Sequence, residues 1–340
     1  MISSKPLLKI LITSPTYPPI NSGLSNAVAQ QAGYLAKAGH EVVVLEKSRG
    51  VGGRMAARRV EGTVVDHGLP LLDVPRDGVL AEFVVDLATD DVIEVEGPGD
   101  PSPGRIIDGA PRLAWPNGMT RLPKALAEGL EVVTDVRVAG IRQDGDLLEV
   151  AQDQGNSLGG FDWVVITAPG AQAADLLDAS PRGAVRASDM RVVAYDPAVM
   201  LLAGVALDAP EWFAHRPLTG PIAYVTNEMA KGRPPVDGVV PFVVRLDADV
   251  SEALMEASDR AVLAEALPAL AKVLGRPAAS PAWVQVKRWR YATARERLDQ
   301  DAINPEWTRV IVAGDAVAAG PHMEDVAATG RWAARRICEA

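Results

Sequence analysis

Cysteine, surplus basic charge and long apolar runs are all scarce in this sequence of 340 residues. Its one cysteine, Cys338, cannot build a disulfide framework or a cysteine metal site. Asp and Glu number 44 against 34 Lys and Arg, which disfavours nucleic acid as a partner. No apolar run is long enough to cross a bilayer, and the run after Lys5 is too short for a signal segment. We therefore expect a protein of the reducing cytoplasm with no membrane partner.

Two patterns of catalytic residues are also missing. The sequence contains no G-x-S-x-G element, so nothing supports serine hydrolysis. No spacing of His, Asp and Glu suggests a metal site, and we expect none. Apolar residues make up 48% of the chain and charged residues 23%, which is typical of a globular protein long enough for two domains.

The N-terminal region has the frame of a dinucleotide-binding βαβ unit. An apolar strand is predicted over 7–13, a helix that ends at Gly39 follows, and a second strand ends at Glu46. Glu46 stands where an acidic residue accepts hydrogen bonds from ribose, although acidic residues at strand ends are common. Counted back from Gly39, however, the G-x-G-x-x-G fingerprint falls on Gly23, Ser25 and Val28. The Ser25 hydroxyl can bond phosphate, whereas Val28 should push the helix away from the strand.

Residues 47–59, KSRGVGGRMAARR, are predicted to form a turn rich in glycine and arginine. Glycine lets the backbone approach a ligand closely, and arginine offers donors suited to phosphate. Directly after the ribose acid, such a turn lies where a pyrophosphate would pass. A solvated basic loop is the alternative interpretation.

Six segments in the same order resemble one family. LEKSRGVGGRMAARR followed by DHG at 66–68 resembles the flavin-dependent amine oxidase superfamily, and most closely its renalase-like branch. The resemblance continues through WPNGMTRLPKALAEGL, FDWVVITAPGAQAADLL, VKRWRYATA and VIVAGDAVAAGPHMEDVAATG, and it covers roughly residues 40–340. It implies FAD as cofactor and hydride transfer from an amine or a dihydronicotinamide-like substrate, with dioxygen as acceptor.

The resemblance also implies which residues bind FAD. They are Gly23, Ser25, Glu46, Lys47, Arg49, Gly52, Gly53, Arg54, Met55, Val138, Gly314, Asp315, Glu324, Asp325 and Val326. Asp325, Val326 and Thr329 depart from the usual small residues and serine of the last motif. The catalytic residues stay unknown, because flavin carries the chemistry. His67 and His322 are candidates near the flavin, and each could equally be a structural residue.

We predict an α/β fold with a discontinuous Rossmann-like FAD-binding domain and an inserted mixed-sheet substrate domain. The first comprises residues 1–72, 118–182 and 304–340, and the second comprises 73–117 and 183–303. The expected partners are a small-molecule substrate and dioxygen, and the oligomeric state stays open.

A second resemblance competes near the N-terminus. Residues 9–44 look like the start of a nucleotide-sugar glycosyltransferase of the two-Rossmann kind, which suggests a natural or engineered recombination. One alternative function is therefore a chimeric or degenerate protein with weak or no flavin binding. A third is nucleotide-sugar binding or transfer, although that family's second domain and its Glu-x7-Glu motif are missing.

Overall fold

The structure is a computed structural model that describes residues 8–14, 26–86, 92–95, 110–153, 155–276 and 280–340. The chain divides into two compact units. The first unit comprises residues 1–53, 122–194 and 294–340, and the second comprises 54–121 and 195–293. Residues 54–72, which we assigned to the FAD-binding domain, thus belong to the second compact unit. The functional domain boundaries stay a prediction, since compactness alone does not assign a ligand.

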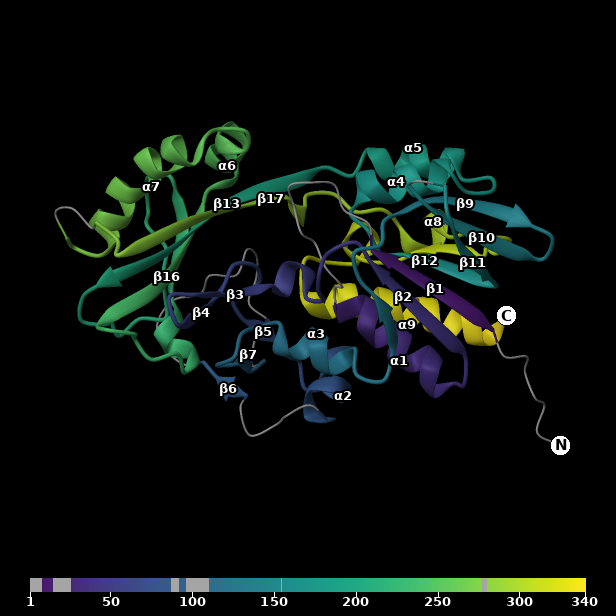
Figure 1. Ribbon diagram of the computed structural model, residues 1–340, viewed down its shortest axis with the longest axis horizontal. Coiled ribbons are helices and arrows are strands. Elements are labelled where there is room, and N and C mark those ends of the chain that lie inside the picture. The colour runs from purple at the N-terminus through teal and green to yellow at the C-terminus, as the bar shows by residue number, and fades with distance from the viewer. Residues whose placement is uncertain (1–7, 15–25, 87–91, 96–109, 154, 277–279) are drawn as a thin grey trace. The chain divides into compact units, whose positions relative to one another are not determined.

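The first unit is built on a five-stranded parallel sheet in the order β18-β12-β1-β2-β8 (Figure 1). Its strands are β1 (Lys9–Ser14), β2 (Glu41–Glu46), β8 (Glu131–Val133), β12 (Trp163–Ile166) and β18 (Val310–Val312). Their sequences are runs of Val, Ile and Leu, as expected for strands that are buried on both faces. Three pieces of chain that lie far apart in sequence therefore meet in one sheet.

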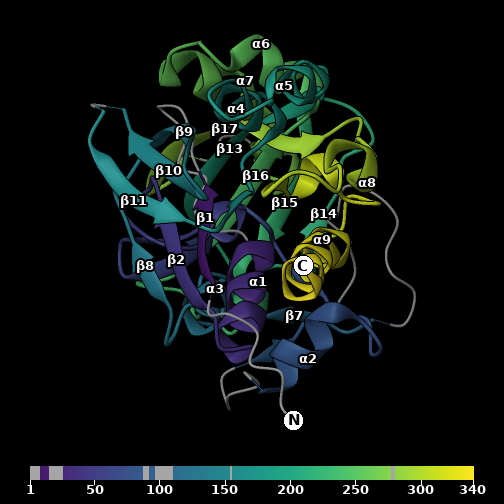
Figure 2. The ribbon, with the colours of Figure 1, turned by 90° about the vertical axis from the view of Figure 1, so that its right-hand side faces the viewer.

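Two helices lie side by side on one face of this sheet, α1 (Asn26–Lys37) and α9 (Met323–Glu339) (Figure 2). Leu35 of α1 and Ile337 of α9 are fully or almost fully buried with Ile10 and Val44 of the strands. Gly39 follows α1 with φ +91°, a left-handed conformation that glycine adopts without strain, and it ends the helix as predicted.

The rest of the first unit comprises a second sheet and short helices. Strands β9 (Val138–Asp144), β10 (Leu147–Gln152) and β11 (Ser157–Phe161) form an antiparallel sheet in the order β11-β10-β9. The helices are α3 (Arg121–Leu126), α4 (Gly170–Asp178), α5 (Ala184–Arg191) and α8 (Gln300–Ile303), with the 3-10 turns η1 (Gly53–Met55) at the unit boundary and η3 (Asp315–Val317).

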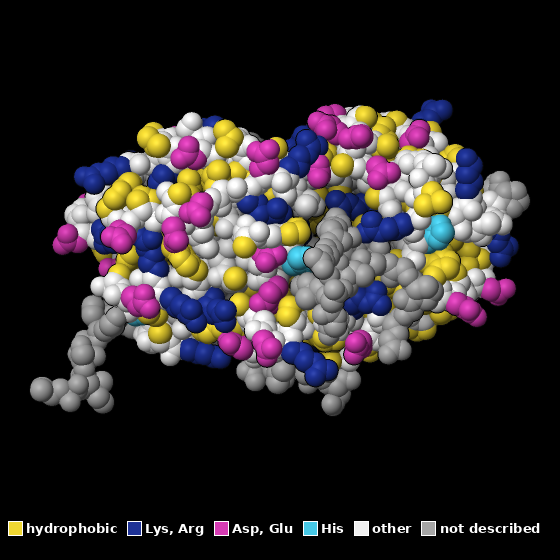
Figure 3. All heavy atoms as spheres, turned by 180° about the vertical axis from the view of Figure 1, so that it is seen from behind, with side chains coloured by type: hydrophobic (Ala, Val, Ile, Leu, Met, Phe, Trp, Pro, Cys, Tyr) yellow, Lys and Arg dark blue, Asp and Glu magenta, His cyan; other side chains and the backbone are white. Residues whose placement is uncertain are grey.

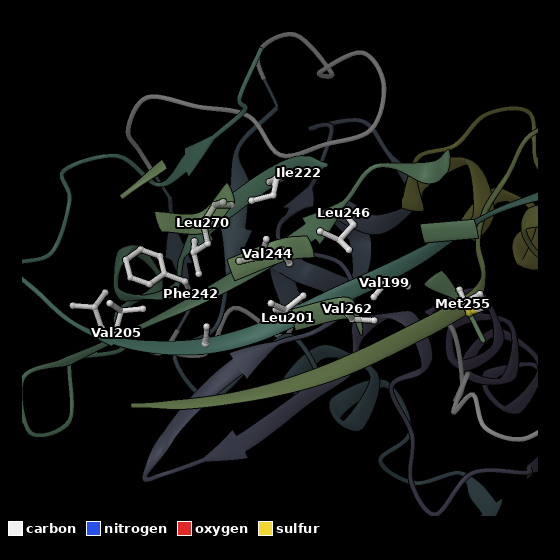
Figure 4. Packing of buried hydrophobic residues seen from close by; sticks show 14 residues of the cluster. Val199, Leu201, Val205, Ile222, Phe242, Val244, Leu246, Met255, Val262 and Leu270 are labelled. Carbon is white, nitrogen blue, oxygen red and sulfur yellow. The ribbon is translucent and has the colours of Figure 1, made fainter. Parts of the chain in front are cut away.

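The second unit is built on a five-stranded sheet in the order β14-β15-β16-β13-β17. The strands are β13 (Tyr195–Ala206), β14 (Ala214–His215), β15 (Ile222–Asn227), β16 (Val239–Leu246) and β17 (Trp283–Ala294). Helices α6 (Ala248–Leu254) and α7 (Asp259–Val273) cover one face. There Leu201, Phe242 and Val244 of the strands pack against Val262 and Leu270 of α7 (Figure 4).

The remaining elements of this unit come from residues 54–121 and from the turn after β15. They are the hairpin β3 (Ala57–Val60) and β4 (Thr63–Asp66), the small sheet of β5 (Leu72–Asp73), β7 (Arg112–Ala114) and β6 (Ile93–Glu94), helix α2 (Val79–Asp86) and the 3-10 turn η2 (Glu228–Lys231). The predicted turn over 47–59 is wrong at its end, because Ala57 to Arg59 pair with β4. The predicted fold class, a Rossmann-like α/β domain together with a second sheet domain, is confirmed. Among the described residues, no helix has the length and apolar character needed to span a membrane.

Candidate functional site

The carboxyl ends of the parallel strands gather the polar residues of the first unit. β1 ends beside Thr13, β2 at Glu46, β12 before Thr167 and β18 before Gly314 and Asp315. In open α/β sheets this edge is where nucleotides bind. Thr13 is 1% exposed, and its hydroxyl has no hydrogen-bond partner among the described residues. A buried hydroxyl without a partner is costly, so this edge offers an unused polar group to a ligand.

Glu46 is fully buried at the end of β2, as the dinucleotide frame predicts. Its Oε1 accepts the backbone N–H of Ser48 at 2.6 Å, which orients the carboxylate across the turn. The segment before β9 runs alongside, because the N–H groups of Asp135 and Val136 donate to the carbonyls of Ser48 and Glu46. The structure thus brings the stretch leading to Val138, itself 2% exposed, next to the acidic strand end.

Gly314 makes a close approach that no other residue could make without strain. Its φ is +110°, and a Cβ atom there would lie 3.3 Å from the carbonyl oxygen of Thr167. Its N–H donates to Oγ1 of Thr329 at 2.8 Å, and that hydroxyl donates to the carbonyl of Val326. Thr329, one of the departures from the family pattern, therefore supplies a hydroxyl that ties α9 to the Gly314 turn. Asp315, 6% exposed, follows immediately.

The start of α9 carries the remaining predicted residues. Asp325 accepts the backbone N–H of His322 through Oδ2 at 3.0 Å, so this carboxylate caps the helix. Glu324 also lies in the first turn, where negative charge suits the helix dipole. Val326 is buried and packs with Ala318. His322 is partly exposed at the cap position.

The residues of the glycine- and arginine-rich segment after β2 differ in their exposure to solvent. Arg49 is exposed, while Gly52 and Gly53 are buried with φ of +133° and +51°. Burial and the nearby Arg137 lower the pKa of Lys47. Met55 is buried, and Nη1 of Arg54 donates to the carbonyls of Tyr291 and Ala292 at 3.4 Å.

Some predicted positions cannot be placed. Gly23 and Ser25 lie outside the described residues, as does most of the proline-rich stretch of the glycosyltransferase resemblance.

In the second unit, the motif segments that carried the resemblance meet one another. Gly68, the residue after His67, packs against the backbone of Arg54. A Cβ atom on Gly68 would lie 2.0 Å from the Arg54 carbonyl oxygen. Oδ1 of Asp66 accepts the backbone N–H of Met119 at 2.9 Å. Nε1 of Trp289 donates to the carbonyl of His67. DHG, the GM segment and the Trp-Arg-Tyr strand therefore form one packed structure.

Asp66 of this structure belongs to a group of four buried charged residues, which we call the charge cluster: Asp66, Glu228, Lys231 and Arg233. Oδ2 of Asp66 accepts from Lys231 Nζ at 3.0 Å and from Arg233 Nη2 at 2.7 Å. Glu228 pairs with the same two cations and accepts the backbone N–H of Asp66. Their side chains are at most 2% exposed. The cluster has two negative and two positive charges and is neutral.

The charge cluster keeps its charged state because every member is paired. Burial alone would raise the pKa of Asp66, but Lys231 and Arg233 outweigh burial and lower it. Burial alone would lower the pKa of Arg233, yet Asp66 and Glu228 raise it. Arg233 also donates to the carbonyls of Trp115 and Pro116, which fixes the segment before Met119.

A second group of polar side chains lies along β17, and we call it the β17 cluster: Arg58, His67, Lys287 and Trp289. The His67 ring stacks on Trp289 with centroids 5.7 Å apart, and Lys287 Nζ lies 4.8 Å from the centroid of the same indole. Arg58 Nη1 donates to Gln285 Oε1 at 2.8 Å. His67 Nδ1 is buried without a hydrogen-bond partner in the described structure.

The charges of the β17 cluster are not balanced. Burial, Lys287 and Arg58 lower the pKa of His67 to about 3, so its imidazole is neutral near pH 7. Burial and Arg58 lower the pKa of Lys287 to about 8. No carboxylate of the described residues forms an ion pair with Lys287 or Arg58. Sequence reasoning singled out His67 but gave Lys287 no role, because the segment VKRWRYATA that contains it was used only for the resemblance.

Another buried cation lies in the first unit and is also absent from the sequence predictions. Arg186 of α5 is 4% exposed and donates to the carbonyls of Ile303 and Val310 and to Asn304 Oδ1. These neutral acceptors hold the segment that leads into β18. Burial and Arg336 lower the pKa of Arg186 to about 10, so it stays charged near neutral pH.

Two limited observations concern metal binding and surface charge in the described parts of the chain. No group of His, Cys, Asp and Glu there could hold a metal ion. On the face seen in Figure 3, basic and acidic side chains are interspersed and no continuous basic field forms.

The parallel sheet, its acidic strand end and its glycine turn have the architecture of a dinucleotide-binding domain. The family model for flavin containing amine oxidoreductase matches residues 104–338, and that for an NAD(P)-binding Rossmann-like domain matches 22–87. The chain belongs to the flavin-containing amine oxidoreductase family.

Solved structures share the fold at low sequence identity. A protein provisionally assigned as a protoporphyrinogen oxidase from an Exiguobacterium species has a TM-score of 0.75 and 13% identity, over 98% of this chain and 99% of that one. A putrescine oxidase with bound putrescine has a TM-score of 0.70 and 15% identity, over 98% and 100%. The cyclohexylamine oxidase of Brevibacterium oxydans has a TM-score of 0.70 and 13% identity, over 98% and 99%.

Proposed function

We propose that this protein is a renalase-like FAD-dependent oxidase that takes hydride from a dihydronicotinamide-like or amine substrate and uses dioxygen as acceptor. The observation that carries the proposal is the meeting of the motif segments in the second unit. Met119 N–H binds Asp66, Trp289 binds the His67 carbonyl, and Gly68 abuts Arg54. These are the segments on which the renalase-like resemblance rests, and their mutual contacts support it.

The residues of the first unit fit the cofactor. Glu46 is a buried, oriented carboxylate that suits ribose hydroxyls, and Thr13 has a spare buried hydroxyl at the same sheet edge. Gly314 provides close backbone approach, and Asp315 follows it. We propose that these residues hold FAD together with the other predicted positions from Gly23 to Val326. Bound by these residues, FAD would supply a hydride acceptor that dioxygen could reoxidise, with hydrogen peroxide as the product.

In this proposal Asp325 supports cofactor binding indirectly, by stabilising the start of α9. Its carboxylate is held by the His322 N–H, so it completes the cap of α9. The helix thereby keeps a fixed start, and Val326 and Thr329 hold it against the Gly314 turn.

His67 contributes orientation rather than base catalysis. A histidine with a pKa of about 3 is neutral near pH 7 and a weak base, so it removes no proton efficiently. Its unpartnered Nδ1 is able to make a hydrogen bond with a substrate. We assign it to substrate positioning, and we leave His322 as the second candidate.

The test is reduction of the flavin without oxygen. FAD-loaded protein is mixed anaerobically with reduced nicotinamide nucleotides, including their isomers, or with primary amines, and the visible flavin band is followed. We expect one class to bleach the band, and air to restore it with formation of one peroxide per flavin. FAD retained but bleached by neither class would contradict the proposed substrates. Protein that takes up no FAD would favour the degenerate alternative.

A further inference from the structure

Among the described residues, no carboxylate forms an ion pair with the two cations of the β17 cluster, buried Lys287 and exposed Arg58. Lys287 is 8% exposed, and its ammonium group lies over the Trp289 ring. Arg58 is bound to the neutral Gln285. No ion pair or hydrogen bond from a described residue compensates the Lys287 charge. A buried cation in this state is unfavourable unless a partner arrives.

The other buried cations described in this unit have carboxylate partners. Lys231 and Arg233 each form ion pairs with two carboxylates, those of Asp66 and Glu228, and their side chains are at most 2% exposed. The two buried cations of the charge cluster are therefore neutralised by carboxylates. Within the described part of this unit, buried Lys287 differs from them, because it has neither a carboxylate nor a hydrogen-bond acceptor as partner.

The geometry points to an anion-binding subsite at Lys287, assisted by Arg58, that receives a phosphate or carboxylate group of the substrate. Alternation along β17 puts Gln285, Lys287 and Trp289 on one face of the strand, since residues two apart share a face. Arg58 reaches this face at Gln285 and His67 reaches it at Trp289. An anion beside Lys287 would therefore have an indole ring and the spare His67 Nδ1 close by.

This subsite also selects against one substrate class. A diammonium substrate would meet the positive charges of Lys287 and Arg58, and like charges without a counterion repel each other. The inference rests on the proposed function and deepens it, because it favours nucleotide-like or acidic substrates over simple polyamines.

The test compares ligand pairs that differ by one anionic group. Nicotinamide mononucleotide and nicotinamide riboside differ by a phosphate, and ornithine and putrescine differ by a carboxylate. Binding is measured by calorimetry on protein whose FAD has been reduced beforehand under nitrogen, so that no hydride transfer takes place. The variants are Lys287→Met and Arg290→Met. Arg290 is the matched control, because it loses a charge on the opposite face of the same strand, where it pairs with Glu256.

In the native protein we expect the anionic member of at least one pair to bind roughly tenfold to a hundredfold more tightly than its neutral or cationic analogue. The phosphate pair and the carboxylate pair tell which anion the subsite accepts. Lys287→Met should abolish the preference, and Arg290→Met should keep it. Equal affinities within both pairs, or a preference that survives Lys287→Met, would overturn the inference.

The same titration on FAD-free protein separates this inference from the proposed function. An anion preference that depends on Lys287 in protein unable to retain FAD would support the subsite while the oxidase proposal fails. FAD retention and substrate oxidation without any anion preference would do the reverse. Circular dichroism of each variant checks that loss of binding does not reflect loss of folding.

Discussion

Two sets of charges in the second unit are built in opposite ways. The charge cluster is buried and pairs Asp66 and Glu228 with Lys231 and Arg233, so its net charge is zero. The β17 cluster places buried Lys287 against an indole ring, with Arg58 nearby at the surface, and no carboxylate of the described residues forms an ion pair with either cation. Balanced charges tie segments of the fold together, whereas an unbalanced buried charge has an energetic cost that an anionic ligand would offset. We therefore assign a structural role to the charge cluster and the proposed ligand-binding role to the β17 cluster.

The largest effect should come from unbalancing the charge cluster. Asp66→Asn keeps the shape and the acceptor for Met119 but removes one of the two negative charges beside Lys231 and Arg233. We expect the free energy of unfolding in urea to fall by about 3–5 kcal/mol. Asp259→Asn, which breaks an ion pair with Arg288 on the surface, serves as control and should cost under about 1 kcal/mol. Equal losses for the two variants would refute the distinction.

The next effect concerns pH and His67. The pKa of His67 is about 3 in the folded protein and 6.5 in its ordinary state. The unfolded chain therefore binds more protons between these values, and stability is lost as pH falls below about 6.5. At pH 4.5 this one group should cost roughly 2–3 kcal/mol relative to pH 7. The unfolding free energy of His67→Gln, measured at both pH values, should show a loss smaller by about that amount. Parallel pH profiles would count against a buried neutral histidine.

Lys287→Met should stabilise the protein while weakening the proposed anion binding. The folded pKa of about 8 lies below the ordinary 10.5, so the cost of the buried charge is fully present below pH 8. Between pH 8 and 10.5 the folded state loses its proton first, and the native protein regains stability. At pH 7 the variant should gain roughly 1–3 kcal/mol in urea unfolding, because loss of the cation–π contact offsets part of the benefit. A destabilised variant would mean that Lys287 has a structural partner.

The smallest effect should come from the cap of α9. Asp325→Ala removes the acceptor of the His322 N–H and should lower the unfolding free energy by about 1 kcal/mol. Asp325→Asn retains an acceptor oxygen and should lose less than half of that. Thermal or urea unfolding measures both. If Asn behaved like Ala, the negative charge rather than the hydrogen bond would be what matters at this position.

The sequence predicted the local elements well where their cause is local. The strand before Ser14 and the helix stop at Gly39 follow from periodicity and from glycine, and the structure has them as β1 and the end of α1. Glu46 was found because its place at a strand end follows from the βαβ frame. Strand β3 was not predicted, because the arginines of 57–59 look like part of the turn over 47–59 until they pair with β4.

The charged clusters could not be predicted in the same way. Asp66 and Arg233 are 167 residues apart in sequence, and only the tertiary fold makes them neighbours. Lys287 lies within the segment VKRWRYATA, but the segment does not reveal its role, which depends on which described side chains surround it in the fold. Arg186 likewise gains its role from the carbonyls of Ile303 and Val310. Such roles come from long-range packing, which a pattern of neighbouring residues does not encode.

One measurement tests the central claim that this chain is a flavin-dependent oxidoreductase. Purified protein is incubated with FAD and desalted, and its visible absorption is recorded beside that of Gly314→Val. That variant puts a branched side chain where even a Cβ atom would lie 3.3 Å from the Thr167 carbonyl oxygen, at a φ of +110°. We expect the native protein to retain a flavin band and the variant to lose most of it. A native protein that stays colourless after desalting would contradict the account.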